Sequence, residues 1–339
     1  MSGGSKDPPY TSAFIMAVIT YLEAIRQALF DEMSADERVF VMGEDVGAYG
    51  GAFKVTEGLQ DKFGEARVID TPISEIAIVG SAIGASYMGM RPVCEIQFID
   101  FIACCFDMLT NFAATSRYRN GAGVPIVVRG PCGGGVGGGP FHSLNPESFF
   151  LNTPGLKMVE PSTAYDAKGL LKAAIRDDDP VLYFEHKFLY RRIKDEVPDE
   201  DYIVPLGKAA VRCEGSDLTI ITFGAMVHTA LDAAKQLEAD GVHAEVLDLR
   251  SLAPLDREAI LASVAKTSRV LLLYEARRTG GIGGELAAII AEEAFEYLDA
   301  PIMRIASEDA PVPYAPPLEA AFLPTVDKVV EGARKLVEY

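Results

Sequence analysis

Cysteine is scarce in this 339-residue sequence, and its placement excludes two classes of small stabilised fold. The five cysteines are odd in number and include no C-x-x-C pair. A disulfide framework needs an even set at regular spacing, and a zinc site needs paired ligands. We therefore expect most of the cysteines to be reduced residues of a protein core. They are Cys94, Cys104, Cys105, Cys132 and Cys213.

Positive charge and long apolar runs are also lacking. The formal net charge is −18, which argues against binding to a nucleic-acid backbone. The apolar stretch 12–22 is too short to cross a bilayer, and it lacks the arginine-rich character of an organelle transit peptide. Residues 1–15 are predicted to be a flexible tail. The sequence thus predicts a cytoplasmic protein with neither a nucleic-acid nor a membrane partner.

Strand-like and helix-like patterns alternate along the chain, which predicts an α/β protein with parallel sheets covered by helices. One α/β unit is expected over residues 16–190 and a second over 207–339. The charged stretch 191–206 between them is predicted to be an interdomain linker. The apolar segment 101–118 is predicted to form one long helix, and residues 284–298 another.

The segment 67–76 carries the strongest functional signal. Residues 67–69 predict a short buried strand that ends before Pro72, because proline lacks the ladder N–H and restricts its predecessor. Ser74 is expected to cap the next helix, which places Glu75 in its first turn, at the carboxyl end of a parallel strand. Open α/β sheets bind ligands at that edge, so Glu75 is a candidate for proton chemistry. The alternative is an acidic residue that only complements the helix dipole.

A loop with six glycines between Cys132 and Pro140 leads into His142. Glycine frees the backbone for unusual dihedral angles and for close approach of a ligand. His142 is therefore a candidate proton donor or acceptor on a mobile loop, and the alternative is an exposed histidine beside a hinge. His186 and His228 have no partners at metal-ligand spacing and are predicted to be structural.

Several motifs occur together in an order typical of one family. They are Gly43-Glu44-Asp45-Val46, Asp70-Thr71-Pro72-Ile73-Ser74-Glu75, Arg91-Pro92-Val93-Cys94-Glu95, His142-Ser143, Asp166-Ala167-Lys168-Gly169-Leu170, Ala174-Ile175-Arg176-Asp177, Asp248-Leu249-Arg250 and Ala310-Pro311-Val312-Pro313-Tyr314. On these motifs the chain resembles the β-subunit of the thiamine-diphosphate-dependent first component of 2-oxo acid dehydrogenase complexes. The resemblance covers nearly everything from about residue 19 onward. It implies a pyrimidine-binding domain of the transketolase type, followed by a transketolase C-terminal-like α/β domain.

The resemblance gives roles to the two candidate residues. Glu75 matches the glutamate that hydrogen-bonds the ring nitrogen of the cofactor's aminopyrimidine. His142 matches the histidine implicated in handling the intermediate and in acylation of the lipoyl group. Residues Ile73, Ile76 and Phe101 are expected to surround the cofactor site with apolar side chains, which would favour proton sharing by Glu75.

The resemblance also implies a bound monovalent cation, usually potassium. The expected donors are backbone carbonyls near Ile126 and Ala174, together with Asp177 and Asp179. Oxygen ligands of this kind suit a hard cation. The cation would organise the loop next to the cofactor.

One family motif is missing from the chain. Members that bind the cofactor diphosphate through a divalent metal use a G-D-G motif, and no G-D-G occurs in this sequence. The resemblance therefore places Mg²⁺ and the diphosphate on a separate α-subunit, in an α2β2 heterotetramer with active sites between α and β. The subunit-binding and lipoyl domains of an acyltransferase core are the further partners it implies. The isolated chain is expected to be catalytically silent.

The resemblance leaves the substrate open, with pyruvate or a branched-chain 2-oxo acid placed ahead of acetoin. A split transketolase-like synthase acting on sugar phosphates is a second hypothesis. It would need a cluster of histidines, whereas this sequence has four scattered ones. A third hypothesis is a scaffold that only docks the acyltransferase core through acidic residues of the second unit. These residues include Glu285, Glu292, Glu293 and Glu296.

Overall fold

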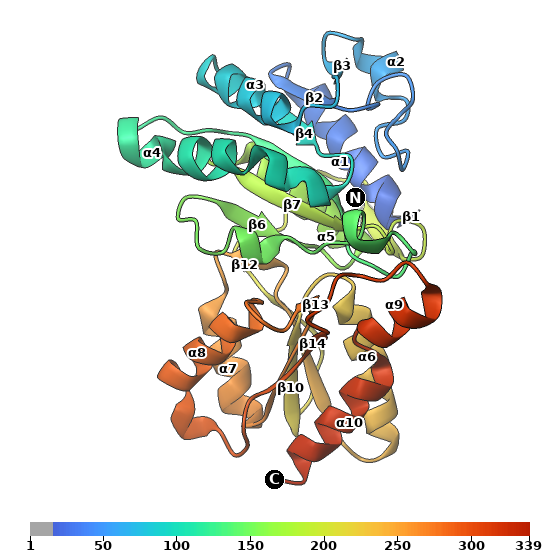
Figure 1. Cartoon of the computed structure of the whole chain (residues 1–339), viewed down its shortest axis with the longest axis vertical. Helices are drawn as coiled ribbons and strands as arrows, with labels where there is room; N and C mark the ends of the chain where they lie inside the picture. The colour runs from blue at the N-terminus through green and yellow to red at the C-terminus, as the bar shows by residue number, and fades with distance from the viewer. Residues whose placement is uncertain (1–15) are drawn as a thin grey trace, which may run out of the picture.

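The computed structural model describes residues 16–339, so the tail predicted over residues 1–15 lies outside the described residues. Two α/β domains follow one another along the long axis of the molecule, each built around a mainly parallel sheet (Figure 1). This arrangement confirms the predicted fold class. None of the helices between residues 16 and 339 combines the length and the apolar character that a membrane span requires.

The first domain is built on a seven-stranded sheet. Its strands are β2 (Val39–Gly43), β3 (Val68–Asp70), β4 (Arg91–Glu95), β5 (Val127–Cys132), β6 (Lys157–Val159), β7 (Val181–His186) and β12 (Ser251–Ala253). They lie in the order β12-β6-β7-β5-β4-β2-β3, and every neighbouring pair is parallel except β12 and β6. Successive side chains of a strand point to opposite faces, so Val41 enters one core of the molecule and Met42 the other.

Helical segments cover both faces of this sheet. They are α1 (Tyr21–Ala35), α2 (Leu59–Phe63), α3 (Glu75–Tyr87), η1 (Ile99–Cys105), η2 (Met108–Ala113), α4 (Ala114–Asn120), η3 (Gly139–Phe141), η4 (Glu147–Phe149) and α5 (Ala164–Arg176). The helices α1 and α5 pack together on one face, and α3 packs with η1 and η2 on the other. α1 begins with a capping box, in which Thr20 and Glu23 each accept a hydrogen bond from the other's main-chain N–H.

The second domain has a five-stranded sheet. Its strands are β9 (Ala210–Cys213), β10 (Leu218–Thr222), β11 (Ala244–Asp248), β13 (Val270–Arg277) and β14 (Met303–Ser307). They lie in the order β14-β13-β10-β11-β9, and only β9 is antiparallel to its neighbour. Its helical segments are α6 (Met226–Ala239), α7 (Arg257–Thr267), α8 (Gly283–Glu293), η5 (Phe295–Tyr297), α9 (Pro316–Phe322) and α10 (Val326–Val337). The helices α6 and α10 cover one face of the sheet, and α7 and α8 cover the other.

Two strands belong to the first domain although the sequence predicts them outside it. The stretch 191–206, expected to be a linker, contains β8 (Lys194–Pro198), which pairs with β1 (Met16–Thr20) in an antiparallel ribbon. β12, from the second predicted unit, adds an antiparallel edge to the sheet of the first domain. In both cases the backbone groups are paired by a segment remote in the sequence, and local pattern does not reveal such a partner.

The single helix predicted over residues 101–118 is wrong in detail. The chain there forms the 3₁₀-helix η1, then the π-helical turn η2, then α4. The buried residues Ile99, Ile102 and Cys105 repeat every three positions, which is the period of a 3₁₀-helix. The helix predicted over 284–298 likewise ends earlier, because α8 stops at Glu293 and the 3₁₀ turn η5 follows.

Candidate active site

Glu75 is the first residue of α3 and lies just beyond the carboxyl end of β3, as the sequence predicts. Ser74 occupies the N-cap position, although its side chain makes no capping hydrogen bond. The side chain of Glu75 is partly exposed, and none of the hydrogen bonds formed among residues 16–339 involves its carboxylate. Its acceptor oxygens are therefore available to a group outside this chain.

A second carboxylate, that of Glu44, lies at the same edge of the sheet. Glu44 follows Gly43, the last residue of β2, and is only 8% exposed. Burial raises the pKa of Glu44, and the nearby charges of Glu75, Asp45 and Glu95 raise it further. Glu44 therefore releases its proton less readily than an exposed glutamate does. Sequence reasoning did not single out Glu44 as a site residue, although its position directly after a buried parallel strand is the same signal that identified Glu75.

Glu95 belongs to a buried ion cluster that sequence reasoning also missed. Arg129 on β5 is fully buried and bonds to Glu95 on β4 and to both carboxylate oxygens of Glu185 on β7. The hydroxyl of Tyr190 donates a further hydrogen bond of 2.6 Å to Glu185. Burial raises the pKa of Glu95, and the positive charge of Arg129 opposes that rise. No local signal marks the cluster, because its members come from separate strands.

His142 directly follows the turn η3, at the end of the glycine-rich loop. Its ring meets the ring of Phe98 edge to face, with centroids 4.1 Å apart, and that of Phe101 with centroids 6.0 Å apart. Phe101 lies on η1, which packs against α3. The structure thus brings His142 and Phe101 together and connects both to the helix that begins with Glu75.

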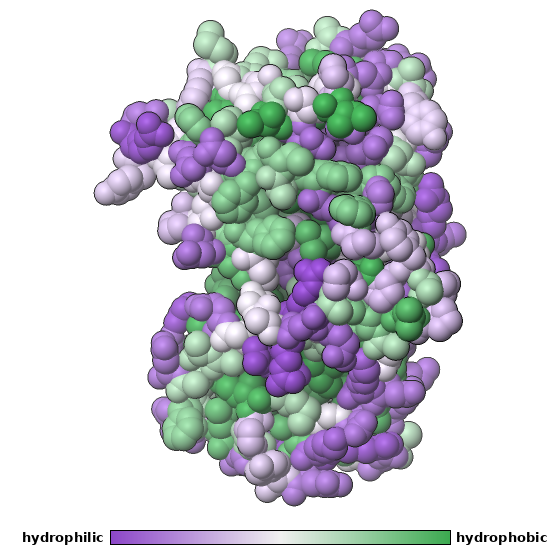
Figure 2. Space-filling model, in the orientation of Figure 1, coloured by the Kyte–Doolittle hydropathy of each residue, from purple (hydrophilic) through white to green (hydrophobic). Residues whose placement is uncertain are grey.

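The apolar surround predicted for the cofactor is not closed by this chain alone. Ile73 is 82% exposed and Ile76 is 49% exposed. Met88, just after α3, and Tyr118 on α4 are also exposed. Figure 2 shows hydrophobic residues gathered on the face of the first domain that carries α4. Exposed apolar surface of this kind is typical of a protein–protein contact.

The residues predicted to hold a monovalent cation lie around the loop that follows α5. They are Ile126, Ala174, Asp177 and Asp179. The carboxylate of Asp177 accepts hydrogen bonds of 2.8 and 2.6 Å from Lys157, and that of Asp179 accepts one of 2.6 Å from Arg117. The carbonyls of the other two residues each accept a main-chain N–H and keep a second lone pair. Both carboxylates are therefore already paired, and the main-chain oxygens are the groups left to bind a cation at this loop. No three acidic, histidine or cysteine side chains within residues 16–339 are arranged to hold a metal ion.

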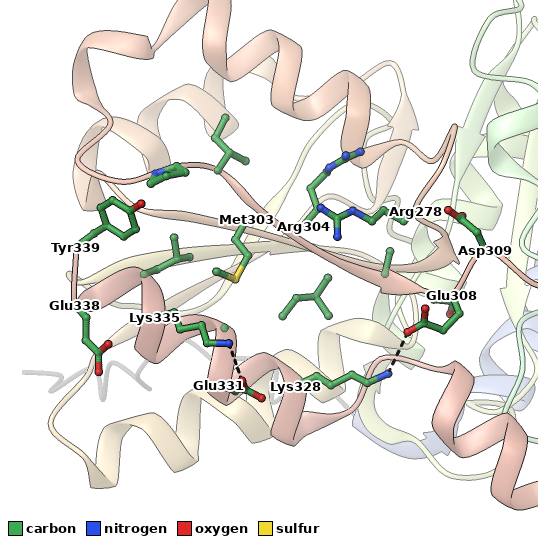
Figure 3. A pocket seen from close by; sticks show the side chains of 17 residues that line it. Arg278, Met303, Arg304, Glu308, Asp309, Lys328, Glu331, Lys335, Glu338 and Tyr339 are labelled. Carbon is green, nitrogen blue, oxygen red and sulfur yellow. Dashed lines mark hydrogen bonds and ion pairs between the residues drawn. The ribbon is translucent and has the colours of Figure 1, made fainter.

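A large cavity of about 1060 Å³ lies between β14 and α10 (Figure 3). Charged side chains of both signs line it, and two of its lysines face carboxylates: Lys335 lies 2.7 Å from Glu331, and Lys328 lies 4.0 Å from Glu308. The cavity belongs to the second domain and includes none of the candidate catalytic residues. It is therefore separate from the edge of the sheet that carries Glu75.

Comparisons with known proteins match the two domains separately. Residues 17–192 match the family "Transketolase, pyrimidine binding domain", and residues 207–329 match "Transketolase, C-terminal domain". The chain is 54% identical over 327 residues to the 2-oxoisovalerate dehydrogenase subunit beta of Bacillus subtilis (strain 168), covering 96% of this chain and 100% of that protein. It is 48% identical over 326 residues to the pyruvate dehydrogenase E1 component subunit beta of the same organism, with the same coverage.

A solved structure described as "Split gene transketolase, inactive beta4 tetramer" superposes with a TM-score of 0.78 at 24% identity. The superposition covers 94% of this chain and 99% of that one, and it supports the fold. The family of the chain follows from its two matched domains and its full-length relatives, and it confirms the resemblance carried by the motifs. The chain belongs to the E1 β-subunits of the 2-oxo acid dehydrogenases, which are built from transketolase-type domains.

Proposed function

We propose that this chain is the β-subunit of a thiamine-diphosphate-dependent 2-oxo acid dehydrogenase and that Glu75 activates the aminopyrimidine of the cofactor. The observation that carries the proposal is the position of Glu75 at the carboxyl edge of a parallel sheet, with no partner for its carboxylate among residues 16–339. When bound, thiamine diphosphate supplies the carbon nucleophile and the electron sink for decarboxylation of a 2-oxo acid.

The role of Glu75 is to share a proton with a ring nitrogen. Glu44 lies at the same edge of the sheet, and its own pKa is raised by burial and then by the charge of Glu75. Arg129 offsets part of the negative charge of Glu95 and Glu185 nearby, which lowers the negative charge in the buried part of this edge.

The role of His142 is proton transfer during acyl transfer to a lipoyl group. An imidazole suits this task because its ordinary pKa lies close to neutral pH. The edge-to-face contacts with Phe98 and Phe101 limit rotation of the ring.

An α-subunit completes the site in this proposal. The chain lacks a G-D-G motif, so Mg²⁺ and the diphosphate are assigned to the α-subunit of an α2β2 heterotetramer. The exposed apolar residues Ile73 and Ile76 flank Glu75 in the sequence and are the expected contacts with that subunit. Their burial there would also provide the apolar surround that this chain does not close.

Potassium is proposed at the loop after α5, bound by the main-chain carbonyls of Ile126, Ala174, Asp177 and Asp179. Lys157 and Arg117 already pair with the two carboxylates, which fixes the loop while leaving carbonyl oxygens for the ion. Replacing KCl with choline chloride at equal ionic strength should lower the melting temperature of the heterotetramer. An unchanged melting temperature would remove the cation from the proposal.

The substrate is proposed to be a branched-chain 2-oxo acid or pyruvate, the substrates named in the relatives at 54% and 48% identity. Acetoin remains the alternative, and comparing rates on 3-methyl-2-oxobutanoate, pyruvate and acetoin decides among them. The acyltransferase core is the proposed partner of the exposed acidic residues at and after α8. If the attraction is electrostatic, the affinity for the core must fall as salt rises. The cytoplasmic location expected from the sequence stays a prediction.

The test of the central proposal is Glu75→Gln in the reconstituted heterotetramer. Glutamine cannot share the proton, so deuterium exchange at the thiazolium carbon of the cofactor should slow by about 10²- to 10⁴-fold. The exposed Glu292→Gln is the matched control and should leave exchange unchanged. Exchange at the wild-type rate in Glu75→Gln would refute the assignment.

A further inference from the structure

The glycine-rich loop of the first domain is held by carboxylates of the second domain. Glu275 on β13 accepts a hydrogen bond of 2.7 Å from the N–H of Gly134. Glu319 on α9 accepts two, of 2.9 Å from the N–H of Gly135 and 3.0 Å from the N–H of Gly137. Both carboxylates are at least nine-tenths buried. Hydrogen bonds from main-chain N–H groups to a buried carboxylate are among the stronger ones in proteins.

Buried positive charge supports this arrangement. The ammonium group of Lys187 donates a hydrogen bond to the carbonyl of Gly133, at the start of the same loop. Burial lowers the pKa of Lys187, and the charges of Glu275, Asp100 and Glu319 act against that fall. The lysine therefore lies among the carboxylates that hold the loop and offsets their negative charge.

The side chain of Tyr314 gives a third contact between the domains, and it explains one of the family motifs. Gly139 has a positive φ of 65°, and a Cβ atom at that position would overlap the ring of Tyr314. The loop therefore turns against the segment that leads into α9. Gly139 is also the first residue of η3, directly before His142.

The segments directly before and directly after His142 in the sequence are thus both held in place. Before it, the loop is bound by Glu275, Glu319 and Tyr314 of the second domain. After it, the N–H groups of Ser143 and Leu144 donate to Asp100 Oδ1, at 3.2 and 3.0 Å. The glycines supply the dihedral angles for this path, and the second domain supplies the acceptors that keep it in one conformation.

We propose that Glu319 is a positioning residue for His142: its carboxylate binds the N–H groups of Gly135 and Gly137 and holds the histidine in place for acyl transfer to the lipoyl group. The inference rests on the proposed function for the role of His142. It goes further because it gives the second domain a part in acyl transfer, through Glu319, and no part in activation of the cofactor. The two steps should therefore respond differently to a change at Glu319.

The experiment uses Glu319→Gln in the α2β2 heterotetramer. A glutamine amide presents an N–H₂ donor to one of the two loop N–H groups, so at least one hydrogen bond is lost with little change of volume. Amide hydrogen exchange over residues 133–144 should rise at least tenfold. Acyl transfer to a free lipoyl domain should fall at least tenfold, while decarboxylation with an artificial electron acceptor stays within twofold of wild type. The exposed Glu331→Gln is the control and should change none of these.

Each outcome decides something different. Unchanged exchange over residues 133–144 overturns the inference whatever the activity. Faster exchange with full acyl transfer also overturns it, because acyl transfer would then not need the loop to be held by Glu319. Should Glu319→Gln fail to fold, Tyr314→Ala loosens the same loop from a half-exposed position and must give the same split between the two rates. Equal loss of decarboxylation and acyl transfer in a folded variant would show a merely structural role.

Discussion

Removing the positive charge of Arg129 gives a sharp test of how the carboxyl edge of the first sheet is stabilised. The Arg129 side chain is 1% exposed, and its partners Glu95 and Glu185 are 6% and 0% exposed. Arg129→Met keeps an apolar side chain of similar length but leaves two buried carboxylates without a counter-charge. Breaking a buried pair in this way costs about 3–5 kcal/mol of unfolding free energy. For a domain of this size, that is a fall in melting temperature of roughly 10 °C.

The pH dependence of the loss identifies its cause. With Arg129 absent, nothing opposes the burial that raises the pKa of Glu95. A carboxyl group whose pKa is raised by folding contributes stability below its unfolded pKa and loses it as pH rises through the folded pKa. The variant should therefore be destabilised less at pH 5 than at pH 8, as measured by urea unfolding followed by circular dichroism.

Two further variants refine this prediction. Adding Glu95→Gln and Glu185→Gln to Arg129→Met removes the unpaired charges, so part of the lost stability should return. Arg38→Met, which removes an exposed partner of Asp36, is the control and should unfold close to wild type. A loss in Arg129→Met below 1 kcal/mol, or one that is equal at pH 5 and pH 8, would refute the reasoning.

Three other perturbations test separate features. Gly139→Ala should cost at least 1 kcal/mol more unfolding free energy than Gly241→Ala, because both have a positive φ but only Gly139 faces a side chain; equal losses would contradict the contact. His186 lowers the pKa of Glu275 to about 2 against the effect of burial. The ionised Glu275 therefore stabilises the folded chain above about pH 4.3, and this contribution to the free energy of unfolding is lost as pH falls toward 2. Glu275→Gln should therefore flatten the acid limb of the stability curve, and an unchanged slope would count against the pair. Ile73→Glu should leave the melting temperature of the isolated chain unchanged but prevent assembly with the α-subunit in sedimentation experiments; normal assembly would exclude this surface as the contact.

Part of the site was predictable because its signals are local. The position of Glu75 follows from a short strand, a proline and a serine, all within a few residues of it. The setting of His142 follows from the glycines that precede it. Glu44 could have been predicted in the same way, since it too follows a buried parallel strand.

Other parts of the site were not predictable from local pattern. The Arg129 cluster joins three strands and a tyrosine. The hydrogen bonds that fix the glycine-rich loop run between the two domains. The irregular helix η1–η2 and the added strand β12 depend in the same way on packing against remote segments. Pairing of this kind depends on which segments fold together, and a single sequence does not state it.

The sequence by itself determined the alternation of strands and helices, the two-domain α/β class and the placement of Glu75, because hydrophobic period and turn chemistry act over a few neighbouring residues. Only the tertiary structure decided which charges are neutralised in the core and which domain holds His142. Those outcomes depend on groups that are distant in the chain and meet where water is excluded, and there pairing a carboxylate or an N–H removes much of the cost of burying it.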